Sequence, residues 1–173
     1  HEVVPRPSGH ELTAFLAELD RRSWRDAPDV LQRAPLSVKA DKVCVLAAVE
    51  RWGRALEYAS DELKGDKEIV LAAVTTDIED ARGAFKWVDK TADMWHEKGF
   101  VLDMVQLNGC ALKFASADCK ADKEIALAAV ESRPDALEFV DKAADMWHDK
   151  RFVLEMVKAN CSALVFATNA LKT

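Results

Sequence analysis

The sequence predicts an all-α protein, built as an α-solenoid-like array of short helical hairpins behind an amino-terminal helical cap. Half of the 173 residues are hydrophobic, and only 6 Gly and 5 Pro are present, which is too few turn formers for an all-β chain. Similar segments of about 25 to 31 residues recur along the chain, with apolar residues at helical spacing inside each. We expect each hairpin to bury its apolar face only against its neighbours.

The repeat is visible in two long, nearly identical segments. Those beginning at Asp66 and Asp122 share Asp-Lys-Glu-Ile, Leu-Ala-Ala-Val, Val-Asp-Lys-x-Ala-Asp-Met-Trp-His and Phe-Val-Leu-x-Met-Val. Each contains a shorter unit that starts with an acid followed by Lys. Five such units begin at residues 41, 66, 97, 122 and 149. We therefore divide the chain into an N-terminal extension with a degenerate capping repeat, residues 1–40, and a helical repeat array, residues 41–173.

The cap begins with a helix. Ser8 and Glu11 form a capping-box pattern, which predicts a helix through about Leu19. Its apolar face comprises Leu12, Phe15, Leu16 and Leu19. Residues 30–34 lie just before the repeat that begins at Asp41, in the same way that residues 55–59 lie just before the repeat that begins at Asp66. We therefore interpret residues 30–34 as part of an incomplete repeat.

Each full unit should open with an amphipathic helix of about ten residues. The acid is its expected N-cap, because a carboxylate accepts hydrogen bonds from free N–H groups of the first turn. Three apolar columns recur, at three, five and eight residues after the acid: Cys44, Ile69, Phe100, Ile125 and Phe152; Leu46, Leu71, Leu102, Leu127 and Leu154; and Val49, Val74, Val105, Val130 and Val157. Positions four, five and eight are predicted to share one buried face, so Leu71→Ala or Leu127→Ala should cost about 2 to 5 kcal/mol.

A second, shorter helix is expected after a break in each unit. The break lies at Trp52-Gly53, Asn108-Gly109 and Ala159-Asn160. The short apolar pattern that follows begins at Ala55, Ala84, Ala111, Ala136 and Ala163. Cys161 stands where Gly109 stands in the earlier unit, and we expect it to reshape a turn that otherwise needs a positive φ.

Three stretches carry a resemblance to a known family. They begin at Asp66 (Asp-Lys-Glu-Ile-Val-Leu-Ala-Ala-Val), at Asn108 (Asn-Gly-Cys-Ala-Leu-Lys-Phe-Ala-Ser) and at Arg54 (Arg-Ala-Leu-Glu-Tyr-Ala-Ser-Asp-Glu-Leu-Lys). Over residues 41–173 the chain resembles the short helical repeat of domain-of-unknown-function family 4116. The resemblance implies stacked helical hairpins in a protein without an assigned enzyme activity, and it supplies no catalytic residue. A subunit of an organelle-associated assembly is a hypothesis that it permits.

Composition excludes several classes of function. With 24 basic and 30 acidic residues the net charge is −6, so the basic footprint of a nucleic-acid binder is missing. The longest apolar run, Val43–Val49, is far shorter than the roughly 20 residues of a membrane span. We expect a soluble, acidic chain. Residues 1–10 show no signal or transit pattern, so either a targeting segment was removed or the chain was cut at an internal point.

The duplicated Asp-Met-Trp-His segments contain the candidate binding residues. Trp95 and Trp147 are either core residues or anchors for a protein partner, since Trp is enriched at interface hot spots. His96 and His148 are either polar linker residues or ligands of a metal or pigment, although a zinc site needs three or four ligands. Trp52 precedes a turn and is expected to be partly exposed, and together with His96 and His148 it is a further candidate for contact with a protein partner.

The cysteines and linker methionines have structural interpretations. Met94 and Met146 fill a column that is apolar in every unit, three residues before the acid, and Cys119 belongs to it. Cys44 lies in a core column, whereas Cys110 should be more exposed. No C-x-x-C pair occurs, so a disulfide framework is not expected.

The functional prediction follows from what the sequence lacks. It shows no Ser/His/Asp ordering, no phosphate-binding glycine loop and no pair of carboxylates in contrasting surroundings. We therefore expect no enzyme activity and no cofactor. The predicted function is a scaffold for protein–protein interaction, an accessory or structural subunit of a larger assembly. The alternative is a metal- or pigment-binding protein that uses the Met-Trp-His segments.

Overall fold

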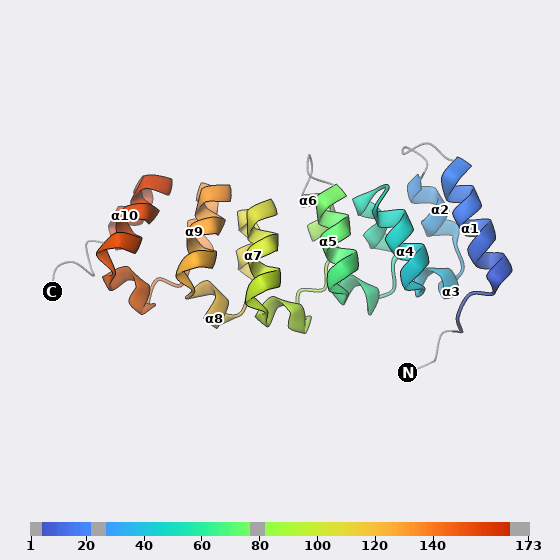
Figure 1. Cartoon of the computed structure of the whole chain (residues 1–173), viewed down its shortest axis with the longest axis horizontal. Coiled ribbons are helices and arrows are strands. Elements are labelled where there is room, and N and C mark those ends of the chain that lie inside the picture. The colour runs from blue at the N-terminus through green and yellow to red at the C-terminus, as the bar shows by residue number, and fades with distance from the viewer. Residues whose placement is uncertain (1–4, 22–26, 77–81, 167–173) are drawn as a thin grey trace. The chain divides into compact units, whose positions relative to one another are not determined.

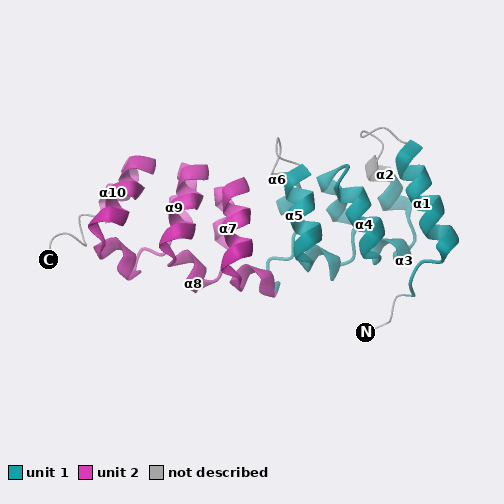
Figure 2. Ribbon diagram, viewed as in Figure 1, with its two compact units in different colours: residues 1–92 teal, residues 93–173 magenta. Residues whose placement is uncertain are grey.

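A computed structural model describes residues 5–21, 27–76 and 82–166. Every regular element in these ranges is a helix, which confirms the all-α prediction (Figure 1). The chain forms two compact units, residues 1–92 and 93–173 (Figure 2). Each unit is described by itself.

The first unit joins the N-terminal cap to the first repeats. Its helices are α1 (Gly9–Arg21), α2 (Ala27–Arg33), α3 (Leu36–Lys39), α4 (Lys42–Val49), α5 (Lys67–Thr76) and α6 (Arg82–Phe85), with 3₁₀ helices η1 (Gly53–Tyr58) and η2 (Leu63–Gly65). The predicted capping box is confirmed: the Ser8 N–H donates to the Glu11 carboxylate at 2.7 Å, and the Glu11 N–H donates to Ser8 Oγ at 3.3 Å. Phe15 and Leu19 of α1 are buried, and α1 packs against α4.

The second unit contains three long helices in succession. They are α7 (Lys98–Leu107), α9 (Lys123–Ser132) and α10 (Lys150–Ala159), and α9 packs against both of the others. The shorter elements are α8 (Ala117–Lys120) and the 3₁₀ helices η4 (Asp93–His96), η5 (Gly109–Phe114), η6 (Pro134–Phe139), η7 (Asp145–His148) and η8 (Cys161–Ala163).

The acids that open the units act as N-caps where they are aspartates. The carboxylate of Asp122, for example, accepts the N–H groups of Glu124 at 3.0 Å and Ile125 at 3.2 Å. Equivalent bonds are made by Asp41, Asp66 and Asp149. The prediction is wrong for Glu97, whose side chain makes no cap hydrogen bond. Short side chains reach the first-turn N–H groups best, and Glu has one more methylene.

The second helix of each hairpin is a 3₁₀ helix in most units, not the α-helix that the apolar pattern suggests. One extended residue immediately precedes it: Trp52, Asn108, Arg133 and Asn160 have φ between −146° and −154°. The chain then tightens at once, and the Ala111 N–H donates to the Asn108 carbonyl at 2.8 Å. Such short connectors are a common use of 3₁₀ geometry.

Gly109 serves a purpose other than the predicted positive φ. Within the described ranges no residue has a positive φ. A Cβ built on Gly109 would instead lie 2.1 Å from the Ala129 carbonyl oxygen, so the absence of a side chain lets η5 approach the backbone of α9. The expectation of a reshaped turn at Cys161 is therefore wrong, because the turn has no positive φ to lose.

The predicted core face is confirmed at positions four and eight and wrong at position five. Residues at positions three and four after the opening acid are buried in all five repeats. Residues at positions seven and eight are also buried, except for the half-buried Val157. Leucines at position five are only half-buried, and Leu154 is 57% exposed. At about 100° per residue, position five lies about 130° from the centre of the buried face. The predicted cost of 2 to 5 kcal/mol at Leu71 and Leu127 is therefore too high.

Candidate functional site

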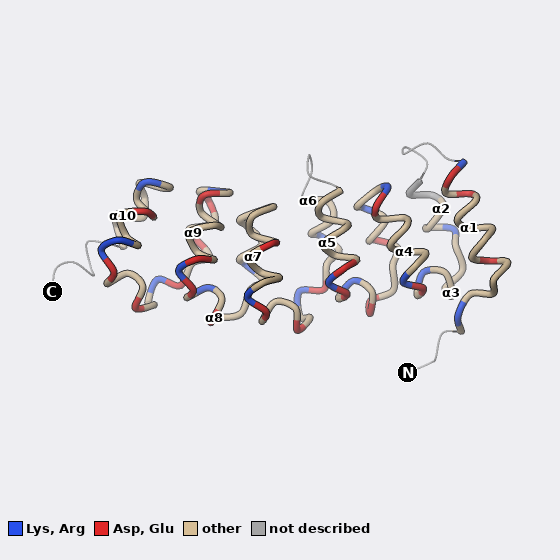
Figure 3. Tube along the Cα trace, in the orientation of Figure 1, with Lys and Arg blue, Asp and Glu red and all other residues tan. Residues whose placement is uncertain are grey.

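Long helices that follow one another within a compact unit are joined by a charged contact, which begins at the lysine after the opening acid in three repeats. In the first unit, Lys42 Nζ lies 2.8 Å from a carboxylate oxygen of Asp66 and 2.8 Å from one of Glu68. Figure 3 shows such charges gathered at the N-terminal ends of the long helices. Because Asp66 also caps α5, one carboxylate both starts its own helix and binds the preceding one.

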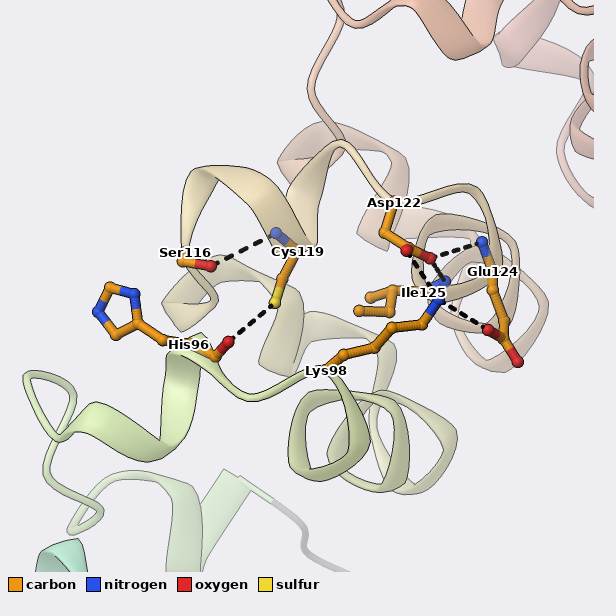
Figure 4. Close-up of polar contacts among 7 residues, drawn as sticks. All are labelled: His96, Lys98, Ser116, Cys119, Asp122, Glu124 and Ile125. Atoms are coloured by element: carbon orange, nitrogen blue, oxygen red, sulfur yellow. Dashed lines mark hydrogen bonds and ion pairs between the residues drawn. The ribbon is translucent and has the colours of Figure 1, made fainter.

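The second unit repeats this contact twice. Lys98 Nζ lies 2.8 Å from Asp122 and 2.9 Å from Glu124 (Figure 4). Lys123 of α9 then binds the cap Asp149 of α10 at 2.5 Å. We call these lysine–aspartate contacts the rungs. The sequence showed the recurring acid–lysine start, but the spacing alone did not show that each lysine binds the following unit.

Protonation equilibria in the rungs favour the charged forms. Partial burial would raise the pKa of Asp122, but hydrogen bonds from Lys98 and the Ile125 N–H outweigh it and lower that pKa below 3.8. The hydrogen bond from Lys123 likewise lowers the pKa of Asp149. Bonds to Asp122 and then Glu124 raise the pKa of Lys98. The rungs are therefore ion pairs at neutral pH.

A backbone hydrogen bond also recurs along the repeats, close in sequence to the rung residues. In four repeats the N–H group of a residue that follows the short helix donates to the carbonyl of the residue two before that repeat's opening acid, as Ser116 does to Trp95 at 3.0 Å. The same bond recurs from Ser60 to Lys39, from Asp89 to Lys64 and from Asp141 to Lys120. Within each unit, hairpins are thus held by both side-chain and main-chain contacts.

Trp95 and Trp147 belong to the core. Their exposed fractions are 1% and 2%. The Trp95 ring centroid lies 5.4 Å from that of Phe100, in an edge-on arrangement, and Trp147 meets Phe152 in the same way at 5.5 Å. The Trp147 indole N–H donates to the Asp141 carbonyl at 2.8 Å. The interpretation of these rings as partner anchors is therefore wrong for this structure, because a partner cannot reach them.

The other predicted site residues lie nearer the surface. His96 and His148 are exposed, and Trp52 is half-buried. Figure 4 shows the His96 ring pointing away from the side chains drawn with it, while its carbonyl accepts a weak hydrogen bond from the Cys119 thiol at 3.9 Å. No three His, Cys, Asp or Glu side chains gather as a metal site in the part of the chain that the structure describes. A binding role for the histidines stays a prediction.

The cysteines divide into buried and accessible pairs, and all four are free. Cys44 and Cys119 are buried as predicted, together with Met94 and Met146. Burial, followed by the nearby Asp41 carboxylate, raises the pKa of Cys44 to about 12, which makes this thiol unreactive. Cys110 is half-buried and Cys161 is exposed.

The surface also carries exposed apolar side chains and hollows. Among the residues that the structure describes, the large hydrophobic residues that are exposed are Leu36, Val43, Leu107, Leu154, Leu164 and Val165. A cleft of about 320 Å³ lies among α1, α2 and α3, with Phe15 and Val30 in its wall. A second hollow, of about 340 Å³, lies between α9 and α10, where Leu127 and Phe152 are bordered by charged side chains.

Among the described helices, none combines the length and apolar character required to cross a bilayer. The family model described as "Domain of unknown function (DUF4116)" matches residues 44–90 and 98–143, which together make up more than half of the chain. No curated protein and no solved structure matched. The family resemblance seen in the sequence is thereby confirmed.

Proposed function

The chain belongs to the DUF4116 family, and we propose that it is a non-catalytic helical-repeat scaffold that binds other proteins. In this proposal it is an accessory or structural subunit of a larger assembly, and its repeats form an α-solenoid-like array. The recurring rungs and backbone bonds support the array, because they set the same register between consecutive hairpins inside each unit.

The observation that carries the proposal is the leucine column. Leu46 and Leu71 in the first unit, and Leu102 and Leu127 in the second, are half-buried at the same position of their helices. Regularly placed apolar side chains that a fold leaves accessible are typical of protein-binding surfaces. Because they sit on rigid helices, little ordering would be needed on binding.

Recovery of partners from the natural source tests this function. The tagged full chain is cross-linked in cells, and chains recovered in stoichiometric amounts are identified by mass spectrometry. Leu102→Gln with Leu127→Gln should reduce their recovery, whereas Gln106→Ala with Glu131→Ala, exposed positions on the same two helices, should not. The proposal is wrong if no chain is recovered stoichiometrically, or if the leucine variant retains every partner.

Metal or pigment binding through His96 and His148 is the second proposal, and the exposure of both rings at equivalent positions favours it. Trp95 and Trp147 are core residues, so within the duplicated segments the exposed His96 and His148 are the ligands of this proposal. An absorption spectrum and elemental analysis of the native protein should then show a pigment or a stoichiometric metal. A blank in both measurements would exclude this second function.

A further inference from the structure

We propose that the hollow between α9 and α10 binds an acidic side chain of a partner protein, together with an apolar side chain beside it. The proposal rests on the scaffold function proposed above, and it names a site and a partner chemistry for that function. We call this hollow the α9–α10 groove. Its apolar side chains are Leu127 and Phe152, and its basic side chains are Lys123 and Arg151.

The equivalent contacts between other long helices contain a carboxylate that this groove lacks. Where α5 follows α4, a carboxylate oxygen of Glu68 lies 2.8 Å from Lys42 Nζ. Where α9 follows α7, Glu124 binds Lys98 in the same way at 2.9 Å (Figure 4). Both glutamates lie two residues after the cap aspartate. In each case the lysine therefore meets two carboxylates, one from the aspartate and one from the glutamate.

Arg151 stands at the position of these glutamates in α10. Among the described residues, Asp149 is therefore the one carboxylate that Lys123 binds, and the Lys123 side chain remains 51% exposed. An ammonium and a guanidinium lie where the other contacts have an ammonium and a carboxylate. Because Arg pairs well with carboxylates through parallel N–H donors, this exchange favours a carboxylate supplied by a partner.

Two further carboxylates border the groove, and neither takes the place of the missing glutamate. Glu124 already binds Lys98 of the preceding helix. Glu155 lies 3.5 Å from Arg151 Nε, and both of these side chains are substantially exposed. Exposed ion pairs of this kind contribute little to stability, so a partner carboxylate can replace Glu155 on the guanidinium.

The accessibility of the groove is supported by the equivalent place on the other side of α9. Although α10 packs against α9, the contact between α7 and α9 stays at the surface, with side chains of Lys98 and Glu124 that are 53% and 62% exposed. A helix on one side of a long helix thus leaves the groove on its other side accessible. By the same geometry, the α9–α10 groove does not depend on what packs against the far side of α10.

The apolar part of the groove makes a protein segment the expected occupant. Leu127 is half-buried and Phe152 is buried, and a volume of about 340 Å³ joins them to Lys123 and Arg151. A segment with an acidic residue next to a large apolar one matches both parts of the groove. A free small carboxylate would fill only the charged part.

Nuclear magnetic resonance tests the groove with a defined probe. The synthetic peptide acetyl-Ser-Glu-Leu-Phe-Ser-amide is titrated into the isotope-labelled full chain. We expect a Kd of about 1 mM, with the largest amide shifts at Lys123, Leu127 and Arg151. The same peptide with Gln in place of Glu should bind at least about fivefold more weakly, because it loses the charge that the two basic side chains meet. Sodium acetate at equal concentration should leave the Leu127 amide unshifted.

Arg151→Glu restores the glutamate of the other contacts and should weaken binding of the Glu peptide at least about tenfold. Arg151→Gln removes the charge without supplying a carboxylate and should weaken it less. Lys158→Glu is the matched control, because it makes the same charge change on α10 outside the groove and should leave binding unchanged. Circular dichroism verifies that each variant keeps its helices.

Several outcomes would overturn the site. They are no shift near the groove at about 5 mM of the Glu peptide, equal binding of the Gln peptide, and equal binding by the Arg151→Glu and control chains. Equal shifts from acetate would identify a free carboxylate as the occupant and overturn the partner segment. A dimer that Arg151→Glu dissociates in sedimentation would identify a second copy instead. Partner recovery from cells tests the scaffold function separately, so partners recovered without peptide binding reject this groove alone.

Discussion

The close approach of η5 to α9 can be tested with a single methyl group. In Gly109→Ala the new Cβ would lie 2.1 Å from the Ala129 carbonyl oxygen and 3.1 Å from the Arg133 Cβ. Real carbon–oxygen contacts are about 1 Å longer than the first distance. The two backbone segments must therefore separate, and the buried packing between η5 and α9 loosens with them.

The expected cost follows from this overlap. Overpacking a well-filled site usually costs about 1 to 3 kcal/mol, and more where the obstacle cannot move. Because the obstacle here is backbone in the middle of α9, we expect about 3 kcal/mol or slightly more. In a chain of this length each kcal/mol lowers Tm by about 2 to 4 °C, so a decrease of about 6 to 12 °C should be seen.

Gly99→Ala provides the matched control, because nothing lies within 4 Å of a Cβ at that position in α7. Ala favours a helix over Gly by about 0.5 to 1 kcal/mol, so this variant should equal or exceed the original stability. Urea and thermal denaturation followed by circular dichroism at 222 nm measure both variants. If Gly109→Ala unfolds at the same urea concentration as the original chain, the η5–α9 contact is not as described.

Four other predictions concern stability and reactivity. The pKa of Asp122 is lower in the folded chain than its ordinary 3.8, so below that pH the unfolded chain binds more protons than the folded one. The free energy of unfolding should therefore decrease as the pH falls below 3.8. Urea midpoints between about pH 5 and 2.5 measure this decrease. Cys161 should react with Ellman's reagent in the native protein and Cys44 only after denaturation. Trp147→Ala should cost about 3 to 5 kcal/mol in urea denaturation, because the ring is a core residue. Leu71→Ala should cost only about 1 kcal/mol, and a loss above 2 would show a fully buried side chain.

Features that depend on a few neighbouring residues were predictable from the sequence. The capping box at Ser8 and Glu11 and the aspartate caps all appear where the pattern put them. Helix starts have local causes, because the cap side chain binds N–H groups two or three residues away. The same locality explains the error at Glu97: the acid column was treated as uniform, although side-chain length decides whether a cap bond forms.

Features that depend on the next hairpin were not predictable in the same way. The leucine column looked like core because its hydrophobicity is as regular as that of the buried columns, and only the packing of α7, α9 and α10 shows which side of each helix is covered. The sequence around Gly109 indicates a turn, whereas the contact that requires a glycine is with Ala129, twenty residues later. Trp95 and Trp147 could equally have been anchors or core, and their burial among phenylalanines decides the question.

The cap aspartate explains why the acid–lysine start recurs so regularly within this chain. A carboxylate has two oxygens, and in Asp122 one of them accepts the N–H groups of its own helix while the other binds Lys98 of the preceding helix. Helix initiation and hairpin stacking are thus coupled through one side chain. An Asn could still cap the helix, but it would lose the charge that Lys98 meets. A Glu could keep the charge but, as Glu97 shows, not the cap. Among the opening acids of the described repeats, only aspartate makes both contacts.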